Sequence, residues 1–267
     1  MPIIKKILFP VDFSQRSIGA ARYVESLAGR FEAEIMLLHV VDAATHGSIA
    51  QKLQPSLQEQ LKAFLADDLR QFVIRRVCTI GDPAEEIVNM VESWAPDLVM
   101  MPSYGLGFYR PSLLGSVTAK VLHDVGCPVW TSVHSEEAPS LERIRCHKVL
   151  CGVDLGVRSR HIFEWALSFA GEDEADLGIV HATRFVEAPP LVAEARSRIA
   201  ALLADAGANA SVLIDGGEPA KVVACAAKEF HADLLVIGRH SDSSDEGCLR
   251  HSAYAIIRES PCPVISI

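Results

Sequence analysis

The 267-residue sequence lacks the features that mark several common classes of protein. Its seven cysteines include no Cys-x-x-Cys pair and are odd in number, which is typical of reduced thiols in a cytoplasm rather than of a disulfide framework. No stretch of about 18 uncharged apolar residues occurs, so we expect no membrane span. The formal net charge is −9 and no basic stripe is present, which argues against non-specific binding to nucleic acid.

Catalytic and metal-binding motifs are missing as well. The sequence contains neither a Walker A lysine motif nor a Gly-x-Ser-x-Gly elbow. His231, His240, Cys248 and His251 lie near one another in the chain, but their spacing matches no recognised zinc-site pattern. The sequence therefore predicts no catalytic residue and no metal site.

The chain instead contains the same pattern twice. Residues 6–12, KILFPVD, recur as 148–154, KVLCGVD, and residues 35–39, IMLLH, recur as 177–181, LGIVH, both 142 positions later. Three further landmarks return in the same order: Gly-Asp/Glu-Pro from 81 and 217, Asp-Leu from 97 and 233, and Cys-Pro-Val from 127 and 262. This order predicts a tandem duplication, with domains at 1–133 and 146–267 joined by a polar linker at 134–145.

Within each repeat, apolar segments alternate with segments of helical spacing. Near-continuous apolar strands between amphipathic helices are typical of a parallel sheet covered on both faces. The predicted fold class is α/β, with two tandem doubly wound, five-stranded parallel sheets of the Rossmann-like type. In the first repeat we expect strands at 5–11, 34–41, 73–79, 97–101 and 128–133, and helices at 14–30, 51–72, 82–94 and from 115 onward.

Two of these helices carry clear start signals. Ser14 is a good N-cap for the first helix. Asp82 is the expected N-cap of a later one, with Pro83 at its first helical position and Glu85 completing a pattern similar to a capping box. We interpret Gly81-Asp-Pro, and its repeat Gly217-Glu-Pro, as turn and cap chemistry with no ligand role.

The stretch 100–120 combines a strand end, a loop with Gly105 and Gly107, and a helix start at Gly115-Ser116. The N–H groups of a first helical turn have no intrahelical partner, and the helix dipole favours an anion there. Ligands of doubly wound sheets bind at the carboxyl ends of the strands, where Asp12 is also expected. The stretch thus predicts a phosphate-binding loop, and the alternative for Gly115-Ser116 is an ordinary helix start.

Taken together, these landmarks resemble the universal stress protein family in its tandem form, once per repeat. The glycine signature of the family's nucleotide-binding branch, Gly-x2-Gly-x9-Gly-(Ser/Thr), is similar to Pro102-x2-Gly105-x9-Gly115-Ser116 here, with proline in place of the first glycine. The resemblance implies a fold like that of the adenine-nucleotide α-hydrolases. It also implies that the two domains pack as a pseudo-dimer through their fifth strands, 129–133 and 264–267.

The resemblance further implies an ATP site in the first domain. Asp12 would face the nucleotide, the backbone at Val40 would contact the adenine, and the turn at 102–105 would follow the ribose. Mg²⁺ or the sugar would offset the charge of Asp12 beside a triphosphate. The full predicted set is Pro10, Val11, Asp12, Val40, Pro102, Gly105, Gly115, Ser116, Val117 and Thr118.

The second repeat departs further from the signature. At the same spacing it reads Gly238-x2-Ser241-x9-His251, so His251 stands where a glycine should open the helix. Loop 242–250 carries three acidic residues against one arginine, whereas loop 106–114 carries a single arginine. Carboxylates beside phosphates oppose binding unless a divalent cation bridges them. We therefore predict one working ATP site, in the first domain, and a degenerate second site.

The leading interpretation is a cytoplasmic stress-response sensor or regulator whose partner is an adenine nucleotide, with no nucleic-acid or membrane partner. Two alternatives stay open. One is a nucleotide-independent protein-interaction module of the same family, and the other is an enzyme that slowly hydrolyses ATP or transfers an adenylyl group. A homodimer also stays open, and the sequence specifies neither the protein partner nor the stress.

Asp12, Asp154, His39 and His181 also have purely structural interpretations. The two aspartates lie where a strand gives way to a helix and can act as loop or N-cap residues. The two histidines end buried strands, so we expect both to be structural and hydrogen-bonded at the rim of the sheet.

Overall fold

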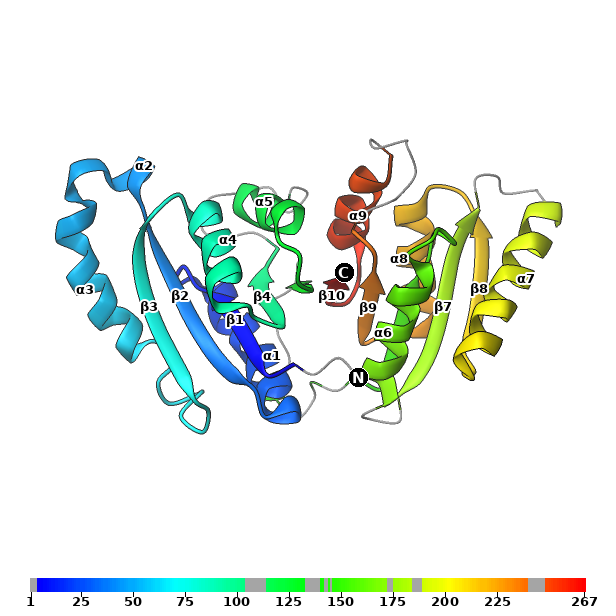
Figure 1. Ribbon diagram of the computed structural model, residues 1–267, viewed down its shortest axis with the longest axis horizontal. Coiled ribbons are helices and arrows are strands. Elements are labelled where there is room, and N and C mark those ends of the chain that lie inside the picture. The colour runs from blue at the N-terminus through cyan, green and yellow to red at the C-terminus, as the bar shows by residue number, and fades with distance from the viewer. Residues whose placement is uncertain are drawn as a thin grey trace. The chain divides into compact units, whose positions relative to one another are not determined.

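The computed structural model describes residues 4–103, 114–132, 140–141, 144, 146–171, 175–183, 189–239 and 248–267 (Figure 1). The chain divides into two compact units, Ile3–Ile144 and Arg145–Ile267. Each unit contains a five-stranded sheet in which every described strand pair is parallel. The predicted α/β fold with two tandem parallel sheets is confirmed.

The first unit alternates strands with helices in the predicted order. Its sheet has the strand order β3-β2-β1-β4-β5, so the direction of winding reverses between β1 and β4. Its elements are β1 (Lys6–Pro10), α1 (Gln15–Phe31), β2 (Glu34–Asp42), α2 (Ala43–His46), the 3-10 turn η1 (Gly47–Ile49), α3 (Ala50–Ala63), β3 (Ile74–Gly81), α4 (Pro83–Trp94), β4 (Leu98–Pro102), α5 (Ser116–Asp124) and β5 (Val129–Ser132).

The second unit repeats this topology. Its strand order, β8-β7-β6-β9-β10, places the reversal between β6 and β9. Its elements are β6 (Lys148–Gly152), α6 (Ser159–Gly171), β7 (Asp176–Thr183), α7 (Pro189–Ala206), β8 (Ser211–Gly216), α8 (Pro219–Phe230), β9 (Leu234–Ile237), α9 (Cys248–Glu259) and β10 (Val264–Ser266).

Helix α1 begins and ends where its local chemistry requires. The Ser17 N–H donates to the Ser14 hydroxyl over 3.2 Å, which confirms Ser14 as the N-cap. Val24 and Ala28 lie on the buried face of the helix, as the apolar spacing predicted. The helix ends after Phe31 because Glu32 adopts a left-handed conformation with φ of 52°.

Helix α4 is capped as predicted, but Glu85 acts differently. The Glu85 N–H donates to Asp82 Oδ1 over 2.9 Å, and Pro83 occupies the first turn, where no N–H partner is needed. The Glu85 carboxylate accepts from Lys120 of α5 over 3.0 Å instead of returning to the cap. The capping-box prediction is therefore right for the bond from the Glu85 N–H to Asp82. It is wrong for the Glu85 side chain, which links α4 to α5 instead.

The helix predicted over 51–72 is too long. Helix α3 ends at Ala63, because Phe64 is extended and Leu65 has a positive φ of 54°. The apolar residues beyond that point still pack into the core, since Leu65 is 8% exposed and Leu69 is fully buried. Burial of these side chains by a turn produces the same sequence pattern as a continued helix.

The ladder between β1 and β4 stops early, and two prolines explain why. Among the described residues, β1 and β4 pair at two positions, the last being Leu8 with Val99, whereas β6 and β9 pair at four. Continuing the first ladder would require an N–H from residue 10 to the carbonyl of Met100 and one from residue 102 to the carbonyl of Pro10, and neither proline has an N–H to donate. The sheet of the first domain therefore loses its hydrogen bonds at the reversal point, where doubly wound sheets bind ligands.

Two aromatic rings pack α1 against the far strand of the first sheet. Trp130 of β5 is 2% exposed, and its ring centroid lies 4.9 Å from that of Tyr23 on α1. Helices α4 and α5 pack against each other. Within the described part of the chain, no helix combines the length and apolar character needed to cross a membrane.

Candidate functional site

Four of the predicted site residues lie together at the carboxyl ends of β1 and β2. The Val11 N–H donates to the Leu38 carbonyl over 2.8 Å, and β1 has ended by this point. Backbone groups two residues apart on a strand point to the same side. The N–H and C=O of Val40 therefore point, like the Leu38 carbonyl, toward the β1 side of β2, at a level beyond the end of β1. Pro10 and Asp12 flank the same edge, so the sequence grouped these residues correctly.

Asp12 organises the turn between β1 and α1. Its Oδ1 accepts from the Ser14 N–H over 3.1 Å, from the Ser14 hydroxyl over 2.5 Å and from the Ser17 hydroxyl over 2.7 Å. These bonds order the first turn of the helix and compensate the charge of the carboxylate. The structural interpretation of Asp12 is thus supported by named contacts, and its ligand role stays a prediction.

The second unit builds the same turn from different neighbours. Asp154 Oδ1 accepts from the Gly156 N–H over 2.7 Å and from the Ser159 hydroxyl over 2.9 Å. The residue after each aspartate has a left-handed backbone, with φ of 62° at Phe13 and 60° at Leu155. The duplication is therefore visible in the hydrogen bonds of the turn as well as in the order of the strands.

His39 and His181 are both hydrogen-bonded at the rim, as expected. His39 Nδ1 lies 2.9 Å from the Val11 carbonyl, and His181 Nδ1 lies 2.8 Å from the Val153 carbonyl. A carbonyl can only accept, so Nδ1 carries the hydrogen in each ring. Burial lowers the pKa of His39, partly opposed by its hydrogen bond to Val11 and by the charge of Asp12.

The lowered pKa of His39 predicts that acid destabilises the first domain. An unfolded histidine has a pKa of about 6.5, so below that pH the unfolded chain takes up this proton before the folded chain does. The contribution to stability is present at pH 7 and is lost as the pH falls toward 5. We expect the free energy of unfolding of the first domain, measured with urea, to fall less between pH 7 and 5 in His39→Gln than in the wild type. An equal fall in the two proteins would contradict this.

Helix α5 begins where the glycine signature predicted. Gly115 is its N-cap, with φ of −61° and ψ of 143°, and supplies no side-chain hydrogen bond. Two bonds fix this end to the sheet: the Gly115 N–H donates to the Ser103 carbonyl over 2.9 Å, and the Thr118 hydroxyl donates to the Pro102 carbonyl over 3.1 Å. The first turn is thus held at the carboxyl end of β4 without a protein side chain at its cap.

The structure brings together most of the predicted site, with one gap. Ser116 is exposed and Val117 is half-buried in the first turn of α5, while Thr118 and Pro102 are buried. Gly105 lies outside the described residues. The role of the whole set in binding ATP stays a prediction.

The equivalent helix of the second domain does not begin where the sequence suggested. We expected His251 to open the helix in place of glycine, but α9 begins at Cys248, so His251 lies within its first turn. Histidine offers no conformational break of the kind that glycine provides, and the residues before it continue the helix. The helix start of the second site is therefore displaced along the chain relative to the first.

A model of the universal stress protein family matches residues 4–132 and, again, residues 146–267. The chain belongs to this family. Universal stress protein MJ0531 of Methanocaldococcus jannaschii is 33% identical over 138 residues, which cover 48% of this chain and 81% of that protein. Universal stress protein MJ0577 of the same organism is 29% identical over 149 residues, which cover 47% of this chain and 92% of that protein.

A solved universal stress protein from Archaeoglobus fulgidus DSM 4304 has the same fold over its length. It matches 100% of this chain and 97% of its own, with a TM-score of 0.80 at 22% sequence identity. The tandem arrangement of two universal-stress-type domains is thus shared with a known structure. Family membership supports a role in the stress response.

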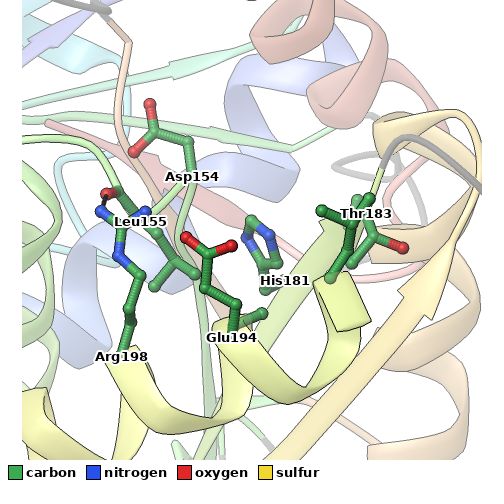
Figure 2. A pocket seen from close by; sticks show the side chains of 9 residues that line it. Asp154, Leu155, His181, Thr183, Glu194 and Arg198 are labelled. Atoms are coloured by element: carbon green, nitrogen blue, oxygen red, sulfur yellow. Dashed lines mark hydrogen bonds between the residues drawn. The ribbon is translucent and has the colours of Figure 1, made fainter. Parts of the chain in front are cut away.

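Inside this family fold, the two domains differ beside the strand ends of β1 and β6. In the first, the Phe13 ring lies 4.3 Å from the His39 ring and 5.1 Å from the Phe64 ring, measured between centroids. In the second, Leu155 replaces Phe13, and a pocket of about 290 Å³ opens between β6, β7 and α7 (Figure 2).

Sequence reasoning missed this pocket. Figure 2 shows Glu194 and Arg198 rising from α7 toward Asp154 and His181. Glu194 and Arg198 are four residues apart on a helix, so they share one face, and this spacing was the signal that could have pointed to them. Nothing in the sequence indicated which neighbouring element that face of the helix would pack against.

The predicted absence of a metal site falls partly outside the described residues. No group of three or more histidine, cysteine, aspartate or glutamate side chains with the geometry of a metal site occurs in the described part of the chain. His231 belongs to that part, whereas His240 and the side chains of Cys248 and His251 do not.

Proposed function

We propose that this protein binds ATP in its first domain and acts through that binding as a sensor or regulator of the stress response. The proposal rests on the geometry at the start of α5. Its first-turn N–H groups are not capped by a side chain at Gly115, and hydrogen bonds to Ser103 and Pro102 fix them at the end of β4. Such an end attracts phosphate through both N–H groups and helix dipole.

The carboxyl ends of β1 and β2 offer backbone and carboxylate groups that a nucleotide could contact. The β1–β4 ladder has ended, the backbone of Val40 faces that opening, and Asp12 lies at the same rim. Asp12 already accepts three hydrogen bonds, which reduces its repulsion of a triphosphate. Mg²⁺, with its preference for phosphate and carboxylate oxygens, would offset the remaining charge.

One specific observation favours the nucleotide-independent alternative. Phe13, His39 and Phe64 pack their rings together beside β1 and β2, at the place where the second domain has a pocket. An adenine ring could enter there only if Phe13 moved. A protein-interaction module would have no need of that movement.

Equilibrium dialysis with radiolabelled ATP and Mg²⁺ tests the proposal. We expect one nucleotide per chain, because α9 lacks the helix start found at Gly115. Two nucleotides per chain would refute the degenerate second site, and none would favour the interaction module. Analysis of the dialysed nucleotide for ADP and AMP would separate binding from a slow hydrolase or adenylyl-transfer enzyme.

We also propose that the protein resides in the cytoplasm, which is a reducing compartment. Cys78, Cys151 and Cys262 are buried thiols that form no disulfide among the described residues. Burial raises the pKa of Cys151 to about 12, which leaves it protonated and unreactive at neutral pH. This pattern fits structural thiols that are never required to form disulfides.

A further inference from the structure

Helix α3 packs against β3 and β2 with few buried side chains (Figure 1). Of its 14 residues, Ala50 and Leu61 are buried, whereas the 17 residues of α1 include eight buried ones. Pro55 lies inside α3, where it supplies no N–H to the carbonyl four residues earlier. The half-buried residues of α3 are two leucines and two glutamines, Leu53, Gln54, Leu57 and Gln58. An element with so little apolar burial can open locally while its domain stays folded.

The backbone on both sides of α3 is suited to a hinge. Gly47, between α2 and α3, has φ of 51° and ψ of −133°, a conformation that favours glycine. At the other end of the helix, Phe64 is extended and Leu65 has φ of 54°. Hinges are residues at the ends of elements that absorb changes in φ and ψ. The segment between Gly47 and Leu65 can therefore turn as one body.

Hydrogen bonds with β3 hold both parts of α3 in place. Arg76 of β3 donates through Nε to the Leu61 carbonyl over 3.0 Å and through Nη2 to the Phe64 carbonyl over 3.4 Å. The guanidinium thus caps carbonyls at the C-terminal end of the helix. Nearer the N-terminus, Gln54 Nε2 donates to the Cys78 carbonyl over 2.9 Å. Side-chain hydrogen bonds of this kind contribute little net free energy, so α3 can be released at small cost.

The closed position of α3 covers a thiol and completes a ring pair. Cys78 is 8% exposed, and its sulfur lies 4.0 Å from the Gln54 carbonyl. Burial raises the pKa of the Cys78 thiol, which therefore stays protonated at neutral pH while α3 is closed. Phe64, at the end of the helix, packs edge-on against Phe13 with 5.1 Å between the ring centroids. Displacement of α3 would change both environments together.

We propose that α3 is a lid of the first domain, hinged at Gly47 and Leu65 and held closed by Arg76, and that its opening uncovers Cys78 and withdraws Phe64 from Phe13. The sheet and α1 keep their buried side chains when the lid opens, so the rest of the domain stays folded. The proposal goes beyond the binding of ATP and does not depend on it, because it concerns the protein without a ligand.

The rate at which N-ethylmaleimide alkylates Cys78 in the full chain measures the opening of the lid. Mass spectrometry of the peptide that contains Cys78 separates this thiol from the other six cysteines. We expect Arg76→Gln to raise the rate at least about fivefold, because the bonds to the end of α3 are lost. Arg75→Gln is the matched control: it removes the same charge from the neighbouring residue, which is exposed and pairs with Glu34 instead of α3. It should react as the wild type does.

Low concentrations of urea distinguish lid opening from unfolding of the whole domain. Opening of a lid exposes little surface, so the alkylation rate should depend weakly on urea, whereas a rate that follows global unfolding rises steeply. We also expect the backbone amides of α3 to exchange hydrogen faster than those of α1. Equal rates in Arg76→Gln and Arg75→Gln, a steep urea dependence, or equal protection of α3 and α1 would each overturn the proposal.

Discussion

Gly115→Asp is expected to weaken ATP binding at least about tenfold without destabilising the first domain. Aspartate is a preferred N-cap, so its side chain would occupy the N–H groups of the first turn of α5 that the phosphates are proposed to use. It would also place a negative charge beside them. A tenfold loss corresponds to about 1.4 kcal/mol, within reach of losing these N–H bonds and the favourable dipole together.

The same variant should leave folding intact, and this separates binding from stability. An aspartate in place of a glycine N-cap stabilises a helix by a few tenths of a kcal/mol, so the urea midpoint should stay level or rise. Gly126 provides a matched control, because it follows α5 at its other end and a Cβ there would meet open space. We expect Gly126→Asp to bind ATP as the wild type does, and an unchanged affinity in Gly115→Asp would place the nucleotide elsewhere.

Trp130→Ala is expected to have the largest effect on stability. Trp130 is among the largest fully packed side chains of the chain, 2% exposed on β5 and in ring contact with Tyr23. Truncating a buried aromatic residue to alanine costs about 3–5 kcal/mol, because the apolar contacts are lost and a cavity remains. Since native domains are stable by only about 5–15 kcal/mol, such a loss would remove a large fraction of the stability of the first domain.

Urea unfolding can attribute this loss to one domain. A chain of two domains need not unfold in one transition, so each domain needs its own reporter. Trp94 remains in the first domain of Trp130→Ala, and Trp165 reports the second. Trp165→Ala is the control, because that side chain is half-buried and its removal should cost less; its unfolding is followed by far-UV circular dichroism, since the variant lacks the tryptophan of the second domain. A loss below about 1 kcal/mol in Trp130→Ala would contradict the packing of β5 against α1.

The candidate ATP site and the second-domain pocket occupy corresponding corners of the duplicated fold. In the first domain the helix start is open at Gly115, and rings of Phe13 and Phe64 pack beside His39. In the second domain α9 begins earlier and Leu155 leaves a pocket. Duplication followed by divergence of a few side chains can thus give the same corner of one backbone a different surface in each domain.

Much of the fold could be predicted because it depends on local signals. Ser14 and Asp82 cap their helices in the structure as in the sequence, since a capping bond spans only three residues. The internal repeat fixed the equivalence of the two halves through matched landmarks. The helix predicted over 51–72 was wrong beyond Ala63 because a buried turn at Leu65 and Leu69 produces the same apolar spacing as a helix.

The sequence by itself determined the tandem α/β organisation, the parallel sheets and the helix start at Gly115. Only the tertiary structure decided that Pro10 and Pro102 interrupt the ladder between β1 and β4, that Asp12 is bound by the serines of its own turn, and that a pocket lies beside α7 in the second domain. The physical reason is range. Capping and periodicity act between residues close in the chain, whereas a ladder rung or a pocket depends on groups from strands and helices that meet only after folding.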